Sequence, residues 1–287
     1  MKKILVPTDF SQTAENAVNV ALDIAQKAKA TVYFFHTVNT AIDWSSTQLS
    51  VPTKPLTVKE QMEMYPEVSK QIATAQAKLS ELSKRASKMN VDSKIELGYN
   101  LFHEDLARFA EKINTDLIVM GTHGVSGVKE AFLGSNTLKV IRTSNVPVLT
   151  VKNKHKAFKI KTLIYASDFE ETKANKNIER VKAFAEFFGA SIHFVYINTP
   201  VGFEDSAYTI AKIHKVAKEN KISKYYAQVY NDYTVERGII NMAEMLKADL
   251  VALSTHGYSG LRHFINNNVA ENVANHSRVP VLTFRMK

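Results

Sequence analysis

Residues 116–150 read DLIVMGTHGVSGVKEAFLGSNTLKVIRTSNVPVLT, and residues 249–283 read DLVALSTHGYSGLRHFINNNVAENVANHSRVPVLT. The two stretches align without gaps, and fourteen of their 35 positions are identical. Self-similarity on this scale indicates a duplicated unit rather than one large domain. The chain has 287 residues, which is long enough for two such units.

The duplication extends to the N-terminal side of each stretch. VPTDF at residues 6–10 recurs as YASDF at residues 165–169, and ATVYF at 30–34 recurs as ASIHF at 190–194. A short polar, basic run at residues 152–156 separates the two copies, as is typical of a linker. We therefore expect a first domain at residues 1–152 (repeat 1) and a second at residues 159–287 (repeat 2).

The two copies differ in length at one place. Asp9 to Asp116 spans 107 positions and Asp168 to Asp249 spans 81, so repeat 1 has 26 more residues in this interval. The additional residues lie around 44–66 and include Trp44 and three prolines. We interpret this segment as a surface excursion, because a loop this long is either functional or mobile. The sequence does not decide whether Trp44 covers a ligand or anchors the loop.

Short apolar runs alternate in repeat 1 with stretches of helical periodicity. We expect strands at 4–6, 31–38, 95–99, 117–120 and 146–151, and helices over 14–25, 68–89, 106–113 and 137–143. Ser11 is a favourable N-cap for the first helix. Near-continuous apolar strands that alternate with helices predict an α/β fold, with a parallel sheet covered by helices on both faces. Ligands of such sheets bind beyond the carboxyl ends of the strands.

Three glycines and a serine follow the fourth expected strand. Gly121 and Gly124 come directly after it, and Gly134 and Ser135 stand immediately before the next helix. Glycine lets the backbone approach an anion closely, and the N–H groups and dipole at a helix start attract phosphate. The motif is not a Walker A loop, because no Gly-Lys-Ser/Thr is present, and it lacks the position and spacing of a dinucleotide fingerprint. It predicts a phosphate cradle of another type.

The spacing Gly121-x2-Gly124-x9-Gly134-Ser135 resembles the ATP-binding signature of the universal stress protein family. The stretches KKILVPTDFS at residues 2–11 and DLIVMGTHG at residues 116–124 are also similar to that family. The resemblance covers essentially the whole chain as two tandem copies. It implies two Rossmann-like (adenine nucleotide alpha hydrolase-like) domains, each with a five-stranded parallel sheet, and ATP as the ligand, alone or with Mg²⁺. By resemblance, Pro7, Thr8 and Asp9 hold the adenosine, Thr37 lines the base pocket, and Gly121, Gly124, Gly134 and Ser135 hold the phosphates.

Repeat 2 departs from this signature. Asp168 and Gly257 remain, but Ser254 replaces the first glycine, and Asn267 and Asn268 replace the Gly-Ser pair. A Cβ atom at both glycine positions should crowd out a phosphate, although Asn tolerates left-handed backbone angles and can preserve the shape of the loop. We expect repeat 2 to bind ATP poorly or not at all, and to serve as a structural partner or hold a different small ligand.

No motif places a general base, or a loop Lys or Arg, near the phosphates. We therefore expect a nucleotide-dependent regulatory or binding module of the stress response, and the question of catalysis stays open. The alternatives are a low-rate ATPase or nucleotide transferase, and a ligand-free interaction scaffold. The histidines of repeat 2 lack zinc-ligand spacing, so we expect no metal site. By resemblance, the last strands at 146–151 and 279–284 pair the repeats into an intramolecular pseudo-dimer; association of two chains stays open.

Composition limits the remaining classes of partner. The chain has no cysteine, which excludes disulfides, thiolate nucleophiles and Cys-based metal sites and suits a reducing compartment. No apolar run approaches the about 18 residues of a membrane span, so we expect a cytoplasmic protein without a membrane partner. The formal charge of +9 comes from 37 Lys+Arg and 28 Asp+Glu. Because no Lys/Arg block or basic motif with interleaved aromatic residues occurs, solvated helix faces explain this charge better than nucleic-acid binding.

Overall fold

The structure is a computed structural model, and it describes residues 1–38, 59, 66–99, 102–122, 134–169, 175–256 and 269–286. Repeat 1 contains β1 (Lys3–Pro7), α1 (Gln12–Ala28), β2 (Thr31–Thr37), α3 (Pro66–Lys88), β3 (Ser93–Gly98), α4 (Phe102–Lys112), β4 (Leu117–Gly121), α5 (Ser135–Thr143) and β5 (Val148–Val151). Repeat 2 contains β6 (Thr162–Ala166), α6 (Asn175–Phe188), β7 (Ser191–Asn198), α7 (Ser206–Glu219), β8 (Tyr225–Asn231), α8 (Val235–Met245), β9 (Leu250–His256), α9 (Val269–His276) and β10 (Val281–Met286).

Every strand and helix expected from the periodicity of repeat 1 is present. Ser11 is the N-cap of α1, and its side-chain oxygen accepts a hydrogen bond from the Ala14 amide at 3.3 Å. The last strand begins at Val148 rather than at Val146. The intervening Pro147 has no N–H to donate, and its carbonyl accepts the Ile118 amide at 2.9 Å. Apart from Lys59 and Pro66, the excursion expected around 44–66 lies outside the described residues.

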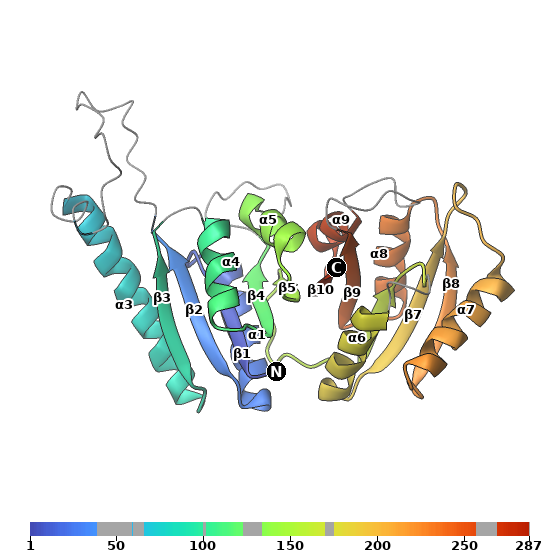
Figure 1. The fold of residues 1–287 in the computed structure, drawn as a ribbon, viewed down its shortest axis with the longest axis horizontal. Helices are drawn as coiled ribbons and strands as arrows, with labels where there is room; N and C mark the ends of the chain where they lie inside the picture. The colour runs from blue at the N-terminus through green and yellow to red at the C-terminus, as the bar shows by residue number, and fades with distance from the viewer. Residues whose placement is uncertain are drawn as a thin grey trace, which may run out of the picture.

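The ten strands of the described residues form one sheet, in the order β3-β2-β1-β4-β5-β10-β9-β6-β7-β8. The five strands of each repeat are parallel to one another. The repeats join through β5 and β10, which pair antiparallel with Leu149 opposite Leu282. In Figure 1 these two strands lie in the middle, with β3 and β8 at the far ends. The predicted α/β class, the five parallel strands of each repeat and the pairing of the last strands are confirmed.

Two apolar layers cover the sheet. On one face, α1, α3, α6 and α7 contribute buried side chains such as Leu79 and Ile213 to a core that runs through both repeats. On the other face, α4, α5, α8 and α9 contribute side chains such as Val140 and Val273 to a second core that also includes both repeats. Each repeat therefore has helices on both faces, as predicted. In the described ranges, no helix is long and apolar enough to cross a membrane.

Specific polar contacts also hold the two repeats together. The backbone amide of Phe158, in the linker, donates to the Asp23 carboxylate of α1 at 2.7 Å, and the Phe158 ring is buried in the first core. On the other face, the Arg142 guanidinium of α5 makes a bidentate contact with the Glu271 carboxylate of α9. Figure 1 shows α5 and α9 beside the junction. The helix that begins at Ser135 is thus anchored to repeat 2 at its far end.

Candidate functional site

A tight turn follows β1 and carries the first group of predicted site residues. The Thr8 amide donates to the Phe35 carbonyl of β2 at 2.9 Å, and the Thr8 hydroxyl oxygen accepts the Phe10 amide at 3.0 Å. Phe10 has φ 63°, and Phe169, its counterpart in repeat 2, has φ 56°. A left-handed conformation is unfavourable for a bulky residue, so the same turn is imposed at the same place in both repeats.

Asp9 presents a carboxylate at the centre of this turn. Its Oδ1 atom accepts the Ser11 amide at 2.9 Å, and its Oδ2 atom accepts no hydrogen bond from the residues that the structure describes. The side chain is only half-buried. Pro7 is buried in β1 and Thr8 has its hydroxyl occupied, so these two residues shape the turn. Of the three predicted adenosine residues, only Asp9 offers an unused side-chain acceptor.

Gly121 ends β4 and lies directly against the start of α1. A Cβ atom at this position would be 2.7 Å from the Thr13 carbonyl carbon and 2.8 Å from the Ala14 nitrogen. Such distances are well inside van der Waals contact, so the close packing of α1 on β4 requires a glycine here. Sequence reasoning assigned Gly121 to phosphate contact alone; the structure adds a packing reason that is independent of any ligand.

The start of α5 forms the other side of this site. The Gly134 amide donates to the Thr122 carbonyl at 2.7 Å, and the Thr137 hydroxyl donates to the Gly121 carbonyl at 3.0 Å, which fixes the first turn to the end of β4. Gly134 is the N-cap and supplies no side-chain cap, and the first turn of α5 has no acidic residue. The amides of Ser135 and Asn136 have no acceptor within the helix, and both residues are exposed.

The two halves of the site meet because β1 pairs with β4, with Leu5 opposite Ile118. The Asp9 turn and the start of α5 therefore flank the carboxyl ends of the same two strands. Gly124 lies outside the described residues, so the structure does not place the middle of the glycine motif. Within the described ranges, no group of three or more His, Cys, Asp or Glu side chains could hold a metal ion.

Thr37, the predicted base-pocket residue, lies one strand further out at the end of β2. It pairs in register with Gly98 of β3. Its hydroxyl oxygen is buried and has no hydrogen-bond partner among the described residues. A Cβ atom on Gly98 would lie 3.0 Å from this oxygen, so the hydroxyl faces β3 rather than β1. A buried hydroxyl without a partner is unusual, and residues 39–58 and 100–101, which adjoin this strand end in the sequence, lie outside the described residues.

His36 is a site residue that sequence reasoning did not single out. Its Nδ1 atom lies 2.7 Å from the Thr8 carbonyl oxygen, and its ring lies 4.6 Å from the Phe10 ring, centroid to centroid. On the Phe10 ring, the Nζ atom of Lys78 in α3 lies 4.9 Å from the ring centroid. The available signal was the position of His36 at the end of β2, beside the turn that follows β1.

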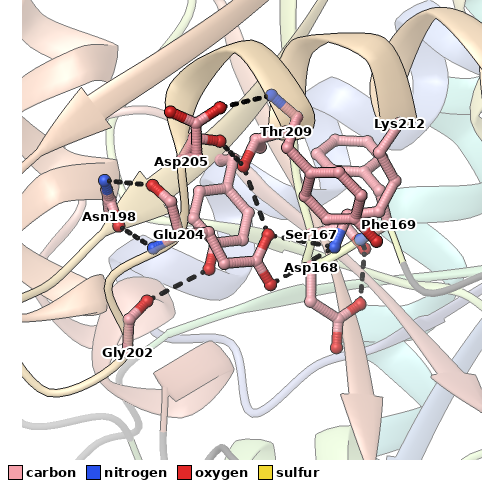
Figure 2. Close-up of polar contacts among 11 residues, drawn as sticks. Ser167, Asp168, Phe169, Asn198, Gly202, Glu204, Asp205, Thr209 and Lys212 are labelled. Carbon is pink, nitrogen blue, oxygen red and sulfur yellow. Dashed lines mark hydrogen bonds and ion pairs between the residues drawn. The ribbon is translucent and has the colours of Figure 1, made fainter.

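In repeat 2, residues at and after the corresponding strand ends make hydrogen bonds and ion pairs with one another, as Figure 2 shows. The Asn198 side chain holds the backbone of Glu204, accepting its amide at 2.9 Å and donating to its carbonyl at 3.1 Å. The Glu204 carboxylate in turn accepts from the Thr209 hydroxyl and pairs with Lys212, both at 3.2 Å. The loop between β7 and α7 is therefore closed over the end of β7 by internal contacts.

Ser254, which replaces Gly121 in repeat 2, is also committed to internal contacts. Its hydroxyl lies 3.0 Å from the Tyr165 hydroxyl and accepts the Asn177 side-chain amide at 3.1 Å. Burial raises the pKa of Tyr165, so its phenol stays protonated and available as a donor. In repeat 1 the aligned residue is glycine, and the helix backbone occupies this space instead.

The two repeats also differ in charge at the helix that follows the glycine motif. The first turn of α9 carries Glu271, whereas the aligned residue in α5 is Leu138. Glu271 is 6% exposed and pairs with Arg142. A carboxylate at a helix N-terminus occupies the place that favours an anion. Asn267, Asn268 and Gly257 lie outside the described residues.

Comparison with known proteins agrees with this architecture. The family model of the universal stress protein family matches residues 1–152 and again residues 159–285. Universal stress protein MJ0577 of Methanocaldococcus jannaschii is 31% identical over 156 residues, which are 54% of this chain and 96% of that protein. Universal stress protein MJ0531 of the same organism is 32% identical over 155 residues, covering 54% of this chain and 84% of the relative.

A solved structure supports the tandem fold over the full length. The crystal structure of a universal stress protein from Archaeoglobus fulgidus superposes with a TM-score of 0.74, covering 99% of this chain and 98% of that one, at 19% sequence identity. At 19% identity, the superposition shows the fold alone. Because the family model matches twice and accounts for nearly the whole sequence, the chain belongs to the universal stress protein family and contains two tandem copies of its domain.

Proposed function

We propose that repeat 1 binds ATP and that the chain acts as a nucleotide-dependent binding or regulatory module of the stress response. The observation that carries this proposal is the start of α5. This helix end has no side-chain cap and no acid in its first turn, and it is fixed to the end of β4 by Gly134 and Thr137. A helix N-terminus with these properties favours phosphate. A cytoplasmic, reducing setting is proposed with it, because the chain has no cysteine.

The chemistry of the residues around the strand ends matches the parts of the ligand. The unused Oδ2 atom of Asp9 is an acceptor for the hydroxyl or amino groups of adenosine, and a carboxylate suits those donors better than it suits phosphate. The amides of Ser135 and Asn136 and the Ser135 hydroxyl are donors for phosphate oxygens. The roles of Gly124 and Thr37 follow from the family signature and are part of the proposal.

We further propose that repeat 2 does not bind ATP, so that each chain binds one nucleotide. Three observations support this. The Ser254 hydroxyl is hydrogen-bonded internally, Glu271 places a carboxylate in the first turn of α9, and Asn198 with Glu204 closes the loop after β7. Repeat 2 then contributes the second half of the sheet and the anchor for α5.

Isothermal titration calorimetry with ATP tests this proposal through Asn136, an exposed residue in the first turn of α5. Asn136→Glu should stabilise the helix slightly, because a carboxylate there complements the dipole. The same charge should repel phosphate and raise the Kd for ATP about tenfold, which corresponds to ~1.4 kcal/mol.

Asn136→Gln is the matched control, since it has nearly the same shape without the charge. It should bind ATP like the parent. A parent protein that gives no binding heat at high-micromolar ATP would contradict the proposal. Equal affinity of the Glu and Gln variants would contradict the placement of the phosphates at α5.

A further inference from the structure

We propose that His36 is a positioning residue of the ATP site, which holds the turn after β1 so that the Asp9 carboxylate faces the ligand. This inference rests on the proposed function of repeat 1. Among the described residues, the Asp9 carboxylate accepts one hydrogen bond, from the Ser11 amide of its own turn. The direction of its carboxylate is therefore set by the backbone on either side, at Thr8 and Phe10.

A hydrogen bond from His36 fixes the residue before Asp9. A carbonyl oxygen only accepts hydrogen bonds, so the His36 Nδ1 atom, at 2.7 Å from the Thr8 oxygen, must carry a proton. The Thr8 amide donates a hydrogen bond to the carbonyl of Phe35, the residue before His36 in β2, at 2.9 Å. Two consecutive residues of β2 therefore hold the N–H and the C=O of Thr8.

The ring of His36 supports the residue after Asp9. It lies 4.6 Å from the Phe10 ring at an interplanar angle of 38°, and Lys78 contacts the same ring from α3. Phe10 needs this support, because a positive φ is unfavourable for a residue with a bulky side chain. A single imidazole thus contacts both neighbours of Asp9.

In the described part of repeat 2, the corresponding side chain makes a hydrogen bond to a different segment. Tyr196 occupies the corresponding register position on β7, one residue beyond Val195, which pairs with Ala166. Its hydroxyl donates to the Gly202 carbonyl at 3.3 Å, so it is directed to the loop before α7. The hydrogen bond from the Ser167 amide to the Val195 carbonyl is 3.3 Å long, whereas the equivalent bond from the Thr8 amide in repeat 1 is 2.9 Å long. The His36 contact therefore occurs in the repeat that has the complete ATP signature.

Two substitutions separate the hydrogen bond of His36 from its ring. His36→Phe keeps an aromatic ring against Phe10 but has no donor, whereas His36→Asn keeps a side-chain N–H near the Nδ1 position but has no ring. In calorimetric titrations with ATP, we expect His36→Phe to raise the Kd about tenfold and His36→Asn to stay within about threefold of the parent. Tyr196→Phe, the matched control in repeat 2, should bind ATP like the parent.

Amide hydrogen exchange without nucleotide provides a readout that does not depend on binding. The amides of Phe10 and Ser11 donate to Thr8 Oγ1 and Asp9 Oδ1, so they report on the turn directly. They should exchange clearly faster in His36→Phe, and only slightly faster than in the parent in His36→Asn, which loses the ring contact with Phe10 but keeps the hydrogen bond to Thr8. Parental ATP affinity or parental amide exchange in His36→Phe would overturn the positioning role. An equal loss of ATP affinity in His36→Phe and His36→Asn would also overturn it. A parent that binds no ATP would instead refute the proposed function, while the exchange rates would still decide whether His36 holds the turn.

Discussion

Gly121→Ala is expected to lower the free energy of unfolding by about 2–3 kcal/mol, the upper part of the range for overpacked positions. The added methyl group would meet the Thr13 carbonyl carbon at 2.7 Å and the Ala14 nitrogen at 2.8 Å. These are backbone atoms of the first turn of α1, and they cannot rotate away as a flexible side chain can. The helix must therefore shift from β4, and urea unfolding should show the loss as a lower midpoint.

Gly202→Ala is the control for this substitution. At Gly202 the nearest atom to an added Cβ is the Thr199 hydroxyl oxygen at 3.6 Å, which is ordinary contact. The free energy of unfolding of Gly202→Ala should stay within about 0.5 kcal/mol of that of the parent. If the two variants unfolded at the same urea concentration, the packing explanation for Gly121 would be wrong.

Asp9→Asn should raise the Kd for ATP about 10- to 100-fold, as expected from ~1.5–3 kcal/mol for a hydrogen bond to a charged group. The amide keeps an oxygen for the Ser11 amide, so the turn and the start of α1 should be preserved. The other carboxylate oxygen becomes an N–H group, which cannot accept from adenosine. Titration with a fluorescent ATP analogue measures the affinity, and the thermal midpoint checks the fold.

The same substitution in repeat 2 serves as its control. Asp168 follows β6 as Asp9 follows β1, and its Oδ1 atom lies 3.4 Å from the Ser167 hydroxyl. Because we propose that repeat 2 binds no ATP, Asp168→Asn should leave the affinity unchanged. Parental affinity in Asp9→Asn would remove Asp9 from the site, and an equal loss in Asp168→Asn would contradict the asymmetry between the repeats.

The fold was predictable because its signals are local or repeated. The apolar runs, the helical periodicity and the N-cap at Ser11 each need only a short window of sequence, and the structure has the corresponding elements. The pairing of β5 with β10 was predictable from the family resemblance. The predicted start of the last strand, at residue 146, is two residues before the observed start at Val148, because Pro147 cannot donate a hydrogen bond to the strand ladder.

Much of the site was not predictable, because its contacts join residues from different strands and helices. Gly121 looked like a ligand glycine until the structure placed the backbone of Thr13 against it. His36 contacts Thr8 across two neighbouring strands, and a pattern within either strand does not show this. The shorter interval of repeat 2 was visible in the sequence. Its closure by Asn198 and Glu204 depends on the path of the loop and became visible only in three dimensions.

The number of ATP molecules bound per chain tests the account most directly. Equilibrium dialysis of the full chain against radiolabelled ATP at saturation counts the sites without assuming where they lie. The account predicts one ATP per chain in the parent and in Asp168→Asn, and a clearly lower occupancy in Asp9→Asn at the same ATP concentration. No bound ATP in the parent, two ATP per chain, or one ATP that persists in Asp9→Asn and disappears in Asp168→Asn would contradict it.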